Sequence, residues 1–77
     1  MNKEELRRAV NCFKQGLRLS PADLSCLFNL GCCFEKLKHY RKAKLMFERI
    51  LEIRPNWPEV HYALCLAAYR LRDFALA

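Results

Sequence analysis

The chain has 77 residues, which leaves room for one small domain that buries only about 60% of the surface of its unfolded form. Apolar residues make up 53% and charged residues 29%, which excludes a disordered tail and suits a soluble folded protein. Two glycines and three prolines argue against collagen, flexible linkers and turn-rich all-β folds. No apolar run is long enough to span a bilayer, and no secretory signal core follows the charged residues 2–5. Lysine and arginine outnumber aspartate and glutamate by 14 to 8, a net charge of +6.

The first two predicted helices cover residues 3–19 and 22–37. Asn2, with a glutamate three residues later, has the spacing of an N-terminal capping box. Residues 20–23 predict the start of the second helix, because a cap hydroxyl, a first-turn proline and an early carboxylate follow one another there. Apolar side chains recur every three or four positions in this helix, the pattern of a buried face: Leu24, Leu27, Leu30, Phe34 and Leu37.

Two further helices are predicted over residues 40–53 and 57–71, with the start of a fifth at Asp73. A short polar break precedes the third helix, and Pro55 ends it because proline disfavours helical geometry in the residue before it. Asn56 is the predicted cap of the fourth helix. The chain therefore alternates helices and short turns throughout.

The sequence repeats with a period of 34 residues. Of 43 overlapping pairs, eight are identical, and they fall mainly on apolar and turn positions. The pairs are Arg7/Arg41, Ala9/Ala43, Phe13/Phe47, Leu17/Leu51, Pro21/Pro55, Leu30/Leu64, Leu37/Leu71 and Ala43/Ala77.

One period carries the spacing Leu27-x-x-Leu30-Gly31-x-x-Phe34, followed by Ala43-x-x-x-Phe47 and Pro55, and resembles the tetratricopeptide repeat. The resemblance implies an all-α fold of antiparallel helix-turn-helix repeats, a segment of a right-handed α-solenoid. In these terms residues 1–23 are the outer helix of a partial repeat, 24–57 a complete repeat, and 58–77 an inner helix with the start of the next outer helix. Gly31 and Ala43 are expected where the paired helices approach most closely. The following period departs from the pattern at His61, Cys65 and Ala68.

The ends of the chain lack the polar cap that terminal solenoid repeats usually present. Phe74 and Leu76 would open an incomplete outer helix. The chain is therefore interpreted as a segment of a longer array. It is expected to be weakly folded or to self-associate through its open ends, and to gain stability when extended past Ala77.

The family resemblance also implies a function, since inner helices of such repeats line a concave groove. The chain would be a protein–protein interaction module, a scaffold or adaptor in a larger assembly that binds a partner peptide or helix. The alternative for the same side chains is packing between repeats. The groove residues implied by the resemblance are Phe28, Asn29, Cys32, Glu35, Tyr62, Leu66, Tyr69 and Arg70.

Binding of a chaperone's C-terminal carboxylate is disfavoured. Members of the family with that function use a lysine and asparagines, then a lysine and an arginine on the next inner helix. Asn29 matches one of these positions, but Glu59 and Ala63 occupy positions that would need to be basic. The Glu59 carboxylate would repel the ligand.

A second hypothesis is a polyanion-binding module for RNA or an acidic protein surface. It would use a basic patch between the second and third helices, made of Lys36, Lys38, Arg41, Lys42 and Lys44. Nucleic acid is the less favoured ligand, because the aromatic residues do not interleave with these cations. Strong salt dependence would distinguish this function from groove binding.

No motif for catalysis or for a cofactor occurs in the sequence, so no enzyme activity is expected. The number of cysteines, five, is odd, which disfavours a set of disulfides. No two of them have the spacing of metal ligands, which disfavours a zinc site. Reduced thiols in an intracellular, reducing compartment, the cytoplasm first, fit this usage better. His61 is expected to pack inside the fold and His39 to be solvated at a turn. The cysteines are Cys12, Cys26, Cys32, Cys33 and Cys65.

Overall fold

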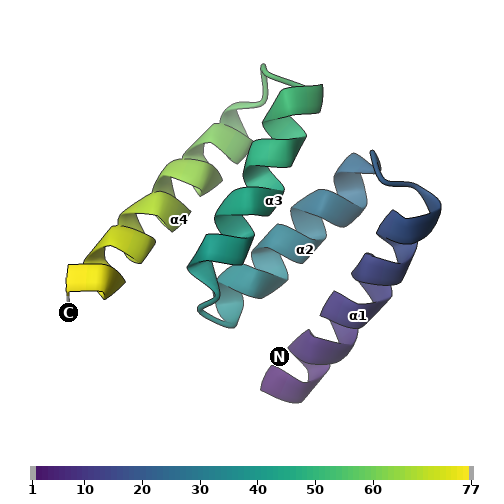
Figure 1. The fold of residues 1–77 in the computed structure, drawn as a ribbon, viewed down its shortest axis with the longest axis horizontal. Coiled ribbons are helices and arrows are strands. Elements are labelled where there is room, and N and C mark those ends of the chain that lie inside the picture. Colours follow the sequence, from purple (N-terminus) through teal and green to yellow (C-terminus); the bar gives the residue numbers. More distant parts are fainter. Residues whose placement is uncertain (1, 77) are drawn as a thin grey trace.

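A computed structural model describes the backbone of residues 2–76 and the side chains of residues 2–72. The chain forms helices α1 (Lys3–Leu19), α2 (Leu24–Lys36), α3 (Tyr40–Ile53) and α4 (Pro58–Leu76). Each helix packs antiparallel against the next in chain order, so that the two ends of the chain lie at opposite sides of the row (Figure 1). The described residues contain no strand. The predicted all-α fold of helix-turn-helix repeats is confirmed.

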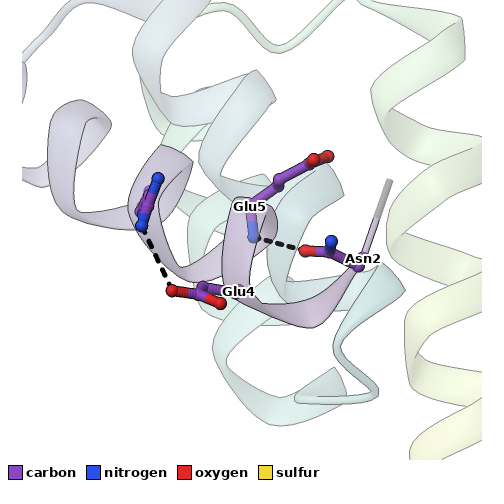
Figure 2. A network of polar contacts seen from close by, with 4 residues as sticks. Asn2, Glu4 and Glu5 are labelled. Carbon is purple, nitrogen blue, oxygen red and sulfur yellow. Dashed lines mark hydrogen bonds and ion pairs between the residues drawn. The ribbon is translucent and has the colours of Figure 1, made fainter.

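The start of α1 follows its sequence signal. The backbone N–H of Glu5 donates to Oδ1 of Asn2 over 2.8 Å, which confirms Asn2 as the cap (Figure 2). Glu4 and Glu5 lie in the first turn, where negative charge favours the helix dipole. Arg8 adds an exposed ion pair with Glu4, one helical turn away, at 3.1 Å.

The start of α2 differs from the prediction. Its cap is Asp23, whose side chain accepts the backbone N–H of Cys26 over 3.2 Å. Ser20 instead ends α1, since its own N–H donates to the carbonyl of Gly16 over 2.9 Å. A carboxylate caps as well as a hydroxyl does and also favours the dipole, so the helix begins at Leu24 and Pro21 belongs to the turn.

The bounds of α3 match the prediction, and Lys38 makes the turn before it in the left-handed region at φ 64°. The start of α4 does not match, because its first hydrogen bonds run to the carbonyl of Trp57 and Pro58 is the first helical residue. Asn56 is therefore not the cap.

The far end of α4 also differs from the sequence prediction. One continuous helix reaches Leu76, in place of a helix that ends at residue 71 and a fifth that begins at Asp73. No glycine or proline interrupts residues 71–76, so nothing in the local sequence forces a turn. The side chains of Phe74 and Leu76 lie outside the described residues, and the division of the chain into three repeats stays a prediction.

The core is centred on the ring of Phe47, which is fully buried between α2 and α3. A Cβ atom added at Gly31 would lie only 2.7 Å from Cε1 of that ring. Ala43, one turn before Phe47, is also fully buried. Gly31 therefore lies at a close approach of the two helices, as predicted, and the Phe47 ring fills the space that it leaves.

A second aromatic contact extends this core to α4. The ring of Phe28 is tilted on Phe47 at 6.1 Å between centroids and stacks on Trp57 at 5.6 Å. The guanidinium of Arg54 covers the Trp57 ring at 5.1 Å. Because Trp57 lies in the turn between α3 and α4, this stack connects that turn to α2.

The Gly31–Phe47 contact predicts the cost of a larger side chain. Gly31→Leu should lower the free energy of unfolding by about 1–3 kcal/mol, because the new atoms must displace a fully buried ring. Gly16→Ala is the matched control on α1, where the added Cβ meets only the Sγ of the half-exposed Cys26 at 3.0 Å. It should change that free energy by less than about 1 kcal/mol. Urea unfolding followed by circular dichroism measures both, and equal effects would contradict the proposed packing.

Candidate functional site

Helices α2 and α4 present the predicted groove residues. Arg70 on α4 and Glu35 on α2 form an ion pair at 3.1 Å between the two helices. The two residues are 35 positions apart in the sequence, so the pair joins successive inner helices in the sense of the repeat. We call the surface formed by the eight groove residues of these helices the α2–α4 face.

Two tyrosines dominate the exposed part of this face. Tyr62 is 71% exposed and Tyr69 is 69% exposed. Seven residues correspond to almost two helical turns, so both rings project from the same side of α4, about 10 Å apart along its axis. Leu66, half-buried, lies between them on the same stripe. The result is an aromatic and aliphatic strip beside the Arg70–Glu35 ion pair.

The α2 side of the face is less available than the sequence suggested. Phe28 is half-buried and engaged by Phe47 and Trp57, so packing between helices accounts for much of its surface. Asn29 is exposed and Cys32 is half-buried. Burial, followed by the nearby Glu35 carboxylate, raises the pKa of the Cys32 thiol, which keeps this thiol protonated at neutral pH.

The residues of the predicted basic patch point in different directions. Lys36, Lys38 and Arg41 are exposed. Lys42 projects from α3 over the Phe34 ring of α2, with Nζ 5.6 Å from the ring centroid. Lys44 is half-buried and lies about 200° from Lys42 around the helix.

A different group of cations, on α1, was missed by sequence reasoning. Lys14 lies opposite Lys42, with Nζ 5.9 Å from the same Phe34 ring, and Arg18 lies one turn farther along α1. The 34-residue period gives no signal for this group, because it pairs Lys14 with Glu48 and Arg18 with Glu52. Only the packing of α1 and α3 against α2 brings these cations together.

The cysteines and histidines form no reactive cluster in the described part of the chain. All five thiols are free, and no group of three or more His, Cys, Asp or Glu residues is arranged to hold a metal ion. His61 is exposed, with Nε2 donating to the carbonyl of Pro55 over 2.6 Å, so the prediction that it packs inside is wrong. His39 is exposed at its turn as predicted and stacks on Phe34. Among the described helices, none has the length and apolar character needed to cross a membrane.

Thiol burial predicts an order of alkylation. Burial raises the pKa of the Cys33 thiol as well as that of Cys32, and desolvation together with the Asp23 carboxylate raises that of Cys26. The thiolate is the reactive form, so these three should react slowly with iodoacetamide at neutral pH and faster as the pH rises. The exposed Cys12 and Cys65 should be labelled first. Peptide mass spectrometry reads each site, with labelling in urea as the control, and uniform labelling of the folded chain would contradict the prediction.

The comparisons with known proteins agree with this architecture. Residues 25–57 match the model of the tetratricopeptide repeat family, a span that contains the Gly31–Phe47 contact. A human protein, the antiviral innate immune response effector IFIT1, is 45% identical over 40 residues, which are 52% of this chain and 8% of that protein. No solved structure matches the chain. With the paired helices and the aligned small residues, these matches show that the chain carries a repeat of the tetratricopeptide family at residues 25–57.

Proposed function

We propose that the chain is a scaffold or adaptor module that binds a peptide or helix of a partner protein on its α2–α4 face. The observation that supports this most directly is the exposure of Tyr62 and Tyr69 on one stripe of α4. Each is a large amphipathic ring held by a rigid helix, and tyrosine is among the residues enriched at the energetic centres of interfaces. Leu66 between the rings adds apolar surface.

The polar groups around the strip would set the orientation of the partner. The Arg70–Glu35 ion pair at its edge has a guanidinium and a carboxylate available to a partner's backbone or side chains. Exposed Asn29 adds an amide donor and acceptor on α2. Glu59, exposed in the first turn of α4, would repel a ligand carboxylate, so a chaperone C-terminus remains disfavoured.

The five free thiols support a reducing, intracellular compartment, the cytoplasm first, as part of the same proposal. Catalysis has no part in it, since interaction repeats act by presenting surface. The antiviral role in the name of IFIT1 is not carried over, because the match covers 8% of that protein. Self-association through the ends of the array stays a prediction.

Truncating both tyrosines tests the proposal. Peptides selected against the 77-residue chain from a displayed random library serve as the probe, with affinities measured by fluorescence anisotropy. Tyr62→Ala with Tyr69→Ala should weaken their binding by about 1–3 kcal/mol per anchor, because each alanine removes an exposed ring that the partner would cover. Far-UV circular dichroism should stay unchanged, because neither ring is buried.

The matched control is Leu19→Ala, which removes a side chain that is 90% exposed at the end of α1. It should leave peptide affinity unchanged. Phe28→Ala is unsuitable as a surface probe, because it removes the stack on Trp57 and should lower stability as well. Peptides that bind the double tyrosine variant as tightly as the wild-type chain would place the binding surface elsewhere.

A further inference from the structure

Helices α1 and α3 flank a cleft whose floor is formed by α2, away from the Tyr62 and Tyr69 strip. It consists of two adjoining cavities of about 360 and 260 Å³, which share Lys14, Phe34 and Lys42 in their walls. We call it the α1–α3 cleft.

The rim of the cleft is strongly cationic. Five of the 14 lysines and arginines of the chain line it: Arg7, Lys14 and Arg18 from α1, and Lys42 and Arg49 from α3. All five are exposed, and no aspartate or glutamate is among the lining residues. Within the part of the chain that the structure describes, none of the five takes part in an ion pair. Their charges are therefore available to an anionic partner.

The floor between these cations is apolar. Leu17, Leu30 and Phe34 lie beneath the cleft, with Leu45 and Met46 on the α3 side. Leu45 is 51% exposed and adds accessible apolar surface to the α3 wall. Methionine beside it has a flexible side chain that adapts to an incoming apolar surface. A ligand that fits this floor must itself be apolar on one side.

The dimensions and charge of the cleft favour a helical, acidic ligand. Arg7 and Arg18, at the two ends of the α1 wall, are 11 positions apart, about 17 Å along the helix, which accommodates about three turns of a helical ligand. An amphipathic helix with aliphatic residues on one face and carboxylates on both flanks would place its apolar stripe on the floor and its acids against the two cationic walls. A second copy of this chain is a poor occupant, because each copy carries a net charge of +6.

Nucleic acid fits the cleft less well than such a helix. Phe34 is the aromatic residue of its floor, but it is 4% exposed and Lys14 and Lys42 lie over its ring. No base could stack there without displacing both lysines, and single-stranded nucleic acid binds largely through stacking. Among the described residues, the exposed tyrosine rings, Tyr62 and Tyr69, belong to the other surface, and the exposed His39 ring in the cleft is already stacked on Phe34.

We infer that the α1–α3 cleft is a second docking site, for an acidic amphipathic helix of a partner protein. The site is independent of the proposed α2–α4 face, since the two surfaces share no residue. Lys14, Lys42, Arg18 and Arg49 recognise the flanking carboxylates, and the floor around Phe34, Leu45 and Met46 accepts the apolar stripe. The chain thereby offers two surfaces of different chemistry to its partners.

A designed probe tests this inference with the 77-residue chain. The probe is a fluorescein-labelled peptide of about 14 residues, with leucine at positions i, i+3, i+4 and i+7 and glutamate at the flanking positions. Lys14→Glu with Lys42→Glu should weaken its binding by about tenfold or more, because two attractions become repulsions at the centre of the cleft. Lys3→Glu with Arg72→Glu is the matched control, with the same change in net charge at exposed positions outside the cleft, and should have a much smaller effect.

Four further measurements identify the occupant of the cleft. The same peptide with glutamine for glutamate should bind weakly, and Leu45→Gln should reduce binding of the acidic peptide severalfold without loss of helicity, since Leu45 is exposed. The Tyr62→Ala, Tyr69→Ala variant should bind the probe as the wild type does. Equal losses of peptide affinity in the cleft and control variants would show that binding depends only on the net charge of the chain, and would overturn the inference. An oligouridine of the same length that binds more tightly than the peptide, with the same dependence on Lys14 and Lys42, would also overturn it in favour of RNA.

Discussion

The placement of the Phe47 ring against Gly31 is the contact on which the rest of the structure depends. The ring is fully buried, and a single carbon atom added at Gly31 would lie 2.7 Å from it. Helices α2 and α3 can therefore approach at this level only because one of them has no side chain there. Leu27 and Ile50, both fully buried, close the same layer. The α2–α3 pair is the unit against which α1 and α4 pack.

In this arrangement the two sides of α2 make different contacts. On one side Phe28 connects Phe47 to Trp57, and Glu35 reaches Arg70, so that α4, which packs on α3, is also connected to α2. On the other side Leu30 and Phe34 form the floor between α1 and α3. Both candidate surfaces therefore depend on α2, one on each of its two sides. A change at the Gly31–Phe47 contact would disturb both surfaces at once, whereas changes at their exposed residues would separate them.

The sequence predicts those features that depend on local or periodic patterns. Asn2 predicts the start of α1 because a capping side chain acts within one turn. The family spacing predicts a close helix approach at Gly31, and the structure places the Phe47 ring there. Prediction from the sequence fails where two local signals compete or where no local signal exists. Asp23 caps α2 in preference to Ser20, and α4 continues through residue 73 because no residue stops it. Phe28 also differs from its expected role, since its exposure depends on where Trp57 lies.

The α1–α3 cleft shows why charge is the least predictable part of such a chain. The lysines that are adjacent in sequence, around residues 36–44, diverge around α3 and its turn. The cations that converge come from helices separated by a whole inner helix, and Lys14 meets Lys42 over a ring contributed by neither of their helices. Repulsion between the two ammonium groups is offset by the negative face of Phe34, which attracts both. A carboxylate placed near both cations would attract each of them, and this charge complementarity is the basis on which an acidic ligand is proposed for the cleft.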